Sequence, residues 1–145
     1  MCVSTPRVYC SWVDVQQSRI SVVASGDQGM TWRSPNGFGV AQAAGSTDSG
    51  GYTIGCDGAS AWVAYGQVED PVTLKQEAGL WMTHTSDGGE TWAPSSLRRG
   101  AAVSVSGVTS CNTGELVYVA WVEDGALVSL GLTTRGRRGR WSRSC

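Results

Sequence analysis

The chain has 145 residues, the size of one ordinary domain, with 20 Gly, 7 Trp and a single Phe. This composition favours a turn-rich all-β fold over a helical one. The formal net charge of −1 excludes a strong electrostatic signal for nucleic acid or an anionic membrane, and no apolar run is long enough for a membrane span. The five Cys lack the spacing of a zinc site, so we expect no metal and no cofactor.

The N-terminal residues lack the apolar stretch of a secretory leader, because Pro6 and Arg7 interrupt it. This indicates either an intracellular chain or a piece of a longer protein whose leader is missing. The sequence therefore leaves the localisation open.

An eight-residue pattern, S/T-x-D-x-G-x-T-W, occurs twice and is called the box below. The first copy is 25–32 and the second is 85–92, and a degenerate third copy at 133–141 lacks the Asp. A further Trp precedes each copy, at positions 12, 62 and 121. Aligning these Trp residues predicts three repeats of about 50–60 residues.

Each repeat is predicted to contain four short strands. The first strands lie near Cys2, at 52–56 and at 108–111, and the second strands contain the Trp-Val pairs. The third strands alternate in polarity, as in Ile20–Ala24, and the fourth is expected to begin at the box Trp. Since no segment has a helical apolar period, four antiparallel strands per repeat describe a β-propeller blade.

The box is predicted to be a locked turn between the third and fourth strands. Its Asp is placed to accept hydrogen bonds from backbone N–H groups ahead of it, and its Gly permits positive φ. Its Trp is expected to bury a large ring. We therefore assign a structural role to Ser25, Asp27, Gly29, Thr31, Trp32, Thr85, Asp87, Gly89, Thr91 and Trp92.

The box resembles the Asp-box, or bacterial neuraminidase repeat, of sialidases and related β-propellers. The resemblance implies three four-stranded blades, approximately 1–42, 43–100 and 101–145, in a single partial propeller. They would form part of a six-bladed ring, either with further blades of the same chain or closed by a second copy as a homodimer. In that family the box lies away from the active site. The early Arg motif F/Y-R-I/L-P is absent here, so no sialidase catalytic residue is carried over.

The opposite, functional face is expected to carry the connections from strand two to three and from strand four to one. The 66–79 loop belongs there and is ten residues longer than its counterparts in the Trp alignment. Weak candidates for catalytic acid and base are Asp14, Glu123 and Asp124. Weak candidates for ligand binding are Tyr65, Glu69, Asp70, Lys75, Arg98 and Arg99. The alternative is packing for Tyr65 and ordinary solvated positions for the charged residues.

Cysteine and histidine are expected to be structural. Cys2, Cys56 and Cys111 are predicted to be small buried apolar residues, as is Cys10, and a disulfide framework would need an oxidising compartment. His84 is expected to be partly buried and hydrogen-bonded. The basic tail, 135–143, is interpreted as an exposed hairpin turn rather than a phosphate-binding segment.

Two classes of function are consistent with these features. The first is a propeller module that binds a glycan or a protein on its loop face and is not catalytic in isolation. The alternative is part of a sialidase-type exo-glycoside hydrolase acting on terminal sialic acids. The absent Arg motif and the missing blades favour the first class, with no specific nucleic-acid partner and no membrane span.

Overall fold

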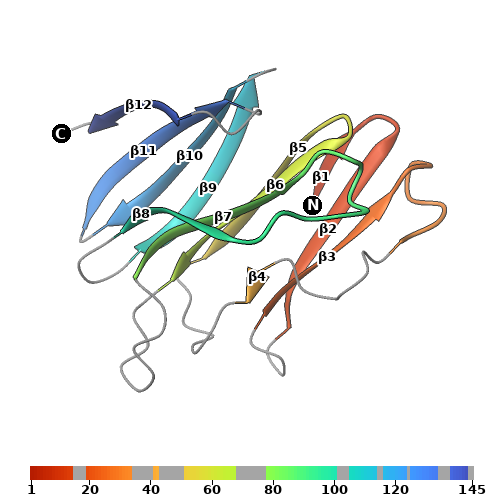
Figure 1. Ribbon diagram of the computed structural model, residues 1–145, viewed down its shortest axis with the longest axis horizontal. Coiled ribbons are helices and arrows are strands. Elements are labelled where there is room, and N and C mark those ends of the chain that lie inside the picture. Colours follow the sequence, from red (N-terminus) through yellow and green to blue (C-terminus); the bar gives the residue numbers. More distant parts are fainter. Residues whose placement is uncertain are drawn as a thin grey trace. The chain divides into compact units, whose positions relative to one another are not determined.

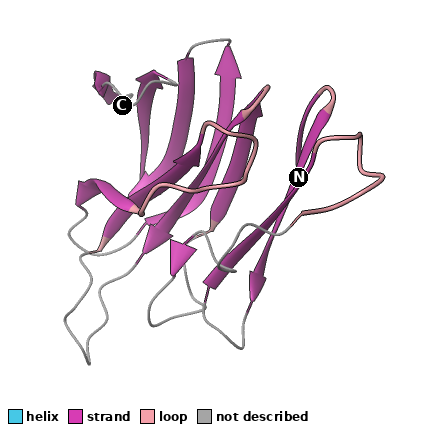
Figure 2. Cartoon of the chain, turned by 45° about the vertical axis from the view of Figure 1, so that its right-hand side comes forward, coloured by secondary structure: helices cyan, strands magenta, loops and turns pink. Residues whose placement is uncertain are grey.

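The computed structural model describes residues 1–14, 19–33, 41–42, 51–67, 78–100, 105–113, 116–123, 125–133 and 138–143. In these residues all regular structure is β-strand, as Figures 1 and 2 show. The prediction of an all-β chain is confirmed over these ranges. Among them there is also no helix long and apolar enough to cross a membrane.

The strands form three four-stranded antiparallel sheets, none closed into a barrel, and each sheet follows the order of the sequence. The first sheet contains β1 (Cys2–Ser4), β2 (Arg7–Asp14), β3 (Arg19–Ser25) and β4 (Ala41–Gln42). The middle sheet contains β5 (Tyr52–Asp57), β6 (Ser60–Gln67), β7 (Gly79–Thr85) and β8 (Ser96–Gly100). The third sheet contains β9 (Val105–Thr113), β10 (Leu116–Glu123), β11 (Ala126–Thr133) and β12 (Arg138–Arg143).

The chain divides into two compact units, which are described separately. The first unit comprises Met1–Thr47, Ile54–Val63 and Met82–Ser96. The second comprises Asp48–Thr53, Ala64–Trp81 and Leu97–Cys145. The first sheet and the box end of the middle sheet therefore belong to one unit, and the third sheet belongs to the other.

The core of the first unit is an apolar cluster shared by two sheets. Tyr9 and Ala24 face each other across the β2–β3 pair and pack with Cys56 and Ala61 of the middle sheet. Trp92, which is partly buried, covers this cluster. Removing a side chain as large as Tyr9 from water contributes about 2 kcal/mol, so this contact is a main source of the unit's stability.

A disulfide between Cys2 and Cys56 ties the same two sheets together, with Cα atoms 5.9 Å apart. The expectation that both are unpaired apolar residues is therefore wrong. The packing of one sheet on the next, which local sequence does not encode, brings the two residues together. The expectation is also wrong for Cys111, which is exposed, while Cys10 is half-buried.

The second unit contains the third sheet, whose central strand is regular over most of its length. β10 pairs with β11 from Leu116 opposite Thr133 to Glu123 opposite Ala126. Val119 and Trp121 are fully buried, as the alternation of a half-covered sheet requires. Residues 138–143, which the sequence placed in an exposed turn, form strand β12 instead.

The structural register corrects the alignment of the first two repeats. The fourth residue of each box makes the same backbone hydrogen bond. Gln28 donates its N–H to the Pro6 carbonyl, and Gly88 donates its N–H to the Ala59 carbonyl. Counting three residues on from each acceptor makes Trp62 the counterpart of Tyr9, not of Trp12. The β2–β3 connection is 15–18 and the β6–β7 connection is 68–78, so the insertion is shorter than the Trp alignment predicts.

Two further expectations differ from the structure around the boxes. The fourth strands begin at Ala41 and Ser96, well after the box Trp in each repeat, although Arg33 forms a single bridge with Ala24. His84 is exposed rather than partly buried, although it alternates with the buried Leu80 and Met82 along β7. The backbone carbonyl of His84 accepts a hydrogen bond from the N–H of Ala93 at 2.9 Å.

We expect loss of the disulfide to lower the free energy of unfolding by about 3 kcal/mol, because the unfolded chain then regains a long loop. Urea denaturation of Cys56→Ser measures this change. Cys111→Ser, which removes an exposed thiol, is the matched control. Equal stability of the two variants would contradict the stabilising role of the disulfide.

Candidate functional site

The first box is closed by the carboxylate of Asp27. The Ser25 hydroxyl donates to Asp27 Oδ1 at 2.7 Å and accepts the N–H of Gly29 at 2.8 Å. Asp27 also accepts the N–H of Thr31 at 2.8 Å and the Thr31 hydroxyl. Gly29 has a φ of 90°, so the turn uses Gly as the sequence predicts.

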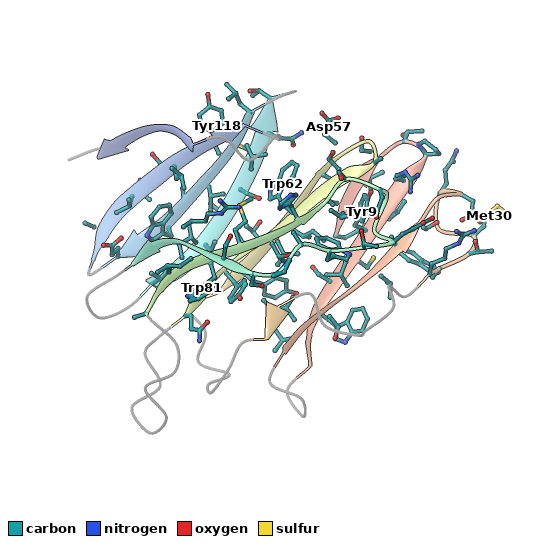
Figure 3. The ribbon with its side chains drawn as sticks, in the orientation of Figure 1. Tyr9, Met30, Asp57, Trp62, Trp81 and Tyr118 are labelled. Atoms are coloured by element: carbon teal, nitrogen blue, oxygen red, sulfur yellow. A yellow bond between two sulfur atoms is a disulfide. The ribbon has the colours of Figure 1, made fainter. Side chains whose placement is uncertain are left out.

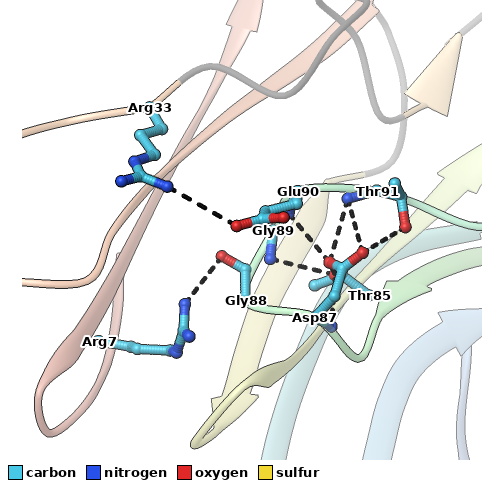
Figure 4. A network of polar contacts seen from close by, with 8 residues as sticks. All are labelled: Arg7, Arg33, Thr85, Asp87, Gly88, Gly89, Glu90 and Thr91. Carbon is cyan, nitrogen blue, oxygen red and sulfur yellow. Dashed lines mark hydrogen bonds and ion pairs between the residues drawn. The ribbon is translucent and has the colours of Figure 1, made fainter.

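The second box repeats this arrangement around Asp87. The Thr85 hydroxyl donates to Asp87 Oδ1 at 2.7 Å and accepts the N–H of Gly89 at 3.1 Å. Asp87 accepts the N–H groups of Glu90 and Thr91 and the Thr91 hydroxyl (Figure 4). The repeated pattern agrees with the predicted turn-locking role.

These hydrogen bonds also set the charge of the box acids. The Thr31 hydroxyl and backbone N–H, followed by the Ser25 hydroxyl, lower the pKa of Asp27 to about 2. The Thr91 hydroxyl and N–H likewise hold the pKa of Asp87 well below its ordinary value. Both carboxylates are therefore ionised at neutral pH and cannot act as general acids.

A polar pocket of about 560 Å³ lies between the two box turns. It is lined by residues from the start of β2, the first box and the tip of the second box. They are Arg7, Ala24, Ser25, Gly26, Asp27, Thr31, Arg33, Gly88, Gly89 and Glu90. The pocket thus belongs entirely to the first unit.

Two guanidinium groups line this pocket in different ways. Arg7 Nη1 donates to the carbonyl of Gly88 at 3.3 Å, and a β-carbon at position 88 would overlap the guanidinium. Arg33 Nη1 lies 3.7 Å from Glu90 Oε1, and both side chains are largely exposed (Figure 4). An exposed ion pair at this distance contributes little to stability, so Arg33 is available to a ligand.

The pocket is equipped to bind an acidic group rather than to transfer protons. Guanidinium groups recognise carboxylates and sulfates through paired hydrogen bonds. The Asp27 carboxylate is already occupied by the turn. Among the described residues, no group of three or more His, Cys, Asp or Glu is placed to hold a metal ion.

The predicted catalytic acids Asp14 and Glu123 belong to different units. Asp14 is the last residue of β2, and Glu123 is the last residue of β10. Glu123 Oε2 accepts the indole N–H of Trp121 at 3.1 Å. Asp124 lies outside the described residues.

The predicted ligand-binding residues fall into three groups. Tyr65 is 1 % exposed, so the prediction that it stacks on a ligand is corrected: its ring packs in the interior. Arg98 and Arg99 lie in β8, and Arg98 is half-buried. Glu69, Asp70 and Lys75 lie outside the described residues.

No sequence pattern indicates Arg7, Arg33 or Glu90 as a site residue. Arg7 meets Gly88 across 81 positions of the chain, and only the packing of the two sheets creates that contact. The two box Trp residues also differ from prediction. Trp92 packs on the core cluster, but Trp32 is 45 % exposed, so its expected burial is wrong.

Comparison with protein-family models, with curated proteins and with solved structures found no match.

We expect acid to destabilise the folded chain through the box carboxylates. Since the pKa of Asp27 is about 2 in the fold and about 3.9 in an unfolded chain, its stabilisation is present above pH ~4 and is lost as the pH falls towards 2. Melting temperatures between pH 2 and 6 should fall less steeply for Asp27→Asn with Asp87→Asn than for the wild type. Asp57→Asn, outside the boxes, is the control, and identical acid slopes would refute the prediction.

We also expect Gly89→Ala to be strongly destabilising. Gly89 has a φ of 91°, and a β-carbon there would lie 2.7 Å from the Ala24 β-carbon. Overpacking and the left-handed backbone together should cost about 2–4 kcal/mol in urea unfolding. Gly26→Ala is the matched control, because nothing lies within 4 Å of its β-carbon position. A similar loss in both variants would argue against a close approach at Gly89.

Proposed function

We propose that the chain is a non-catalytic Asp-box module of β-propeller type that binds an acidic glycan. The observation that carries this proposal is the pocket between the two box turns, where Arg7 and Arg33 line a polar hollow. The repeated box contacts and the four-stranded sheets in sequence order support the propeller assignment.

Binding is favoured over catalysis by the state of the box acids. Glycoside hydrolysis needs two carboxyl groups across the substrate, one of them protonated at the start. The lowered pKa keeps Asp27 ionised, and the turn occupies its oxygens. No observation in the described ranges supports the alternative sialidase-type reaction.

An acidic ligand is favoured by the guanidinium donors of the pocket, because the Asp27 carboxylate that also lines it is already hydrogen-bonded within its turn. Within the described ranges, Arg33 Nη1 pairs with Oε1 of the exposed Glu90, at 3.7 Å. An incoming carboxylate or sulfate can replace Glu90 at little cost, because exposed ion pairs are weak. Arg7, held by Gly88, presents its remaining N–H groups from a fixed position.

Paired glycans test the proposal. We expect 3′-sialyllactose to bind more tightly than lactose in isothermal titration calorimetry, because only the former carries a carboxylate. Arg33→Ala should weaken binding about tenfold, as loss of one charged hydrogen bond predicts. Glu90→Gln should strengthen binding, since it removes the competing carboxylate.

Lys75→Ala, on the predicted loop face, is the control variant. Loss of binding in this variant but not in Arg33→Ala would move the site to the loop face. Equal affinity for the two sugars would contradict an acidic glycan, and binding of a poly-glutamate peptide alone would indicate a protein ligand. Turnover of a fluorogenic sialoside by the chain would overturn the non-catalytic assignment.

A further inference from the structure

The first and third sheets each expose large apolar side chains on one face. On the first sheet these include Val3 and Trp32, and on the third sheet they include Tyr118, which is 42 % exposed. Tyr118 points away from the body of its sheet in Figure 3. Exposed apolar side chains that gather in one contiguous patch are typical of surfaces that another protein covers.

The contact between the first and middle sheets shows how one sheet of this chain receives the next. Tyr9 packs beside Cys56, and its hydroxyl donates to the Gly58 carbonyl at 3.2 Å. The Gly58 N–H donates to the Ser4 hydroxyl at 2.7 Å. Trp92 and the Cys2–Cys56 disulfide complete this contact, which is called the sheet contact below.

The third sheet carries the receiving half of the sheet contact. Cys111 is opposite Tyr118 in the β9–β10 pair, as Cys2 is opposite Tyr9 in the β1–β2 pair. Two residues separate Thr113, the last residue of β9, from β10, and two residues likewise separate Ser4 from β2. Thr113 therefore supplies a hydroxyl at the position of the Ser4 hydroxyl. In the first sheet Tyr9 is fully buried, whereas Tyr118 and the free Cys111 are exposed.

The first sheet carries the inserted half of the sheet contact on its other face. β1 and β5 both end two residues before the next strand, so Val3 corresponds to Cys56. The boxes make Trp32 the counterpart of Trp92. Val3 and Trp32 are both exposed, at 59 % and 45 %. Because Val3 alternates with Cys2, Val3 lies on the face opposite Tyr9, and the box alignment assigns Trp32 to the same face.

We propose that the Tyr118 face of one copy receives the Val3–Trp32 face of a second copy and so repeats the sheet contact between molecules. Tyr118 would then lie beside Val3 and Trp32. The hydroxyls of Tyr118 and Thr113 would meet the backbone of Thr5, the counterpart of Gly58. Cys111 would lie opposite Val3, where the internal contact has its disulfide.

A second copy is the partner that fits both faces residue for residue. In the sheet contact Tyr9 packs near Trp92, and Cys2 is bonded to Cys56. In the proposed contact their counterparts would meet in the same way, Tyr118 with Trp32 and Cys111 with Val3. Since the two faces differ, the association is head-to-tail, and it forms a closed assembly if the rotation between copies allows.

A disulfide trap tests the register of this contact. Val3→Cys supplies the missing partner of Cys111, so air oxidation should give a covalent dimer on a non-reducing gel. The dimer should disappear when Cys111→Ser is added. Met30→Cys is the matched control, because Met30 is more exposed than Val3 and corresponds to Glu90, which stays exposed beside the sheet contact. No covalent dimer from Val3→Cys, or an equal yield from Met30→Cys, would overturn the proposal.

Complementation between variants tests the same contact without a new thiol. Light scattering should show the wild type larger than one copy, with Trp32→Ser and Tyr118→Ser each weakening association at least tenfold. Mixing the two variants should restore association, because the mixture joins an intact Tyr118 face to an intact Trp32 face. A wild type that is still monomeric at about 100 µM, which corresponds to a Kd above that concentration, or no recovery on mixing, would refute the contact.

Discussion

Each box turn depends on one carboxylate that accepts hydrogen bonds from the hydroxyl two positions before it and from the residue four positions after it. Asp27 and Asp87 do this in the first and middle sheets with nearly the same partners. The constraint fixes where β3 and β7 end and holds the box tips beside Arg7. It also decides the chemistry, because a carboxylate that is bound in this way stays ionised and gives no proton to a substrate. The pocket that these turns shape is consequently suited to recognition.

Local structure could be predicted from the sequence, because it depends on residues close in the chain. The box pattern predicts the Asp27 hydrogen bonds and the positive φ of Gly29, and strand propensity predicts the three sets of strands. The sequence does not indicate the one place in the described ranges where a residue other than Gly adopts a conformation that its type disfavours. Gln28 has a φ of 61°, at the position where the second box has Gly88. A Gln side chain does not favour this left-handed conformation, so the residue type does not predict it.

Packing between sheets could not be predicted, because it joins residues that are far apart in the sequence, such as Cys2 and Cys56 at a separation of 54. The alignment of Trp12 with Trp62 was wrong, because the backbone contacts of the box turns make Tyr9 the position in the first repeat that corresponds to Trp62. Neither the Cys2–Cys56 disulfide nor the Arg7–Gly88 contact has a sequence signature of its own. The candidate pocket consists of such contacts, and so it was not anticipated.

The disulfide has a mechanical consequence. Cys2 is the first residue of the first sheet and Cys56 follows that sheet in the sequence, so tension along the chain passes across the sulfur bridge and bypasses the backbone between them. The first sheet then carries no load, and the backbone between Cys2 and Cys56, about 190 Å long when extended, is not stretched. Under stretching, the other strands yield first, and a reductant converts the first sheet from a shielded element into one that unravels with them.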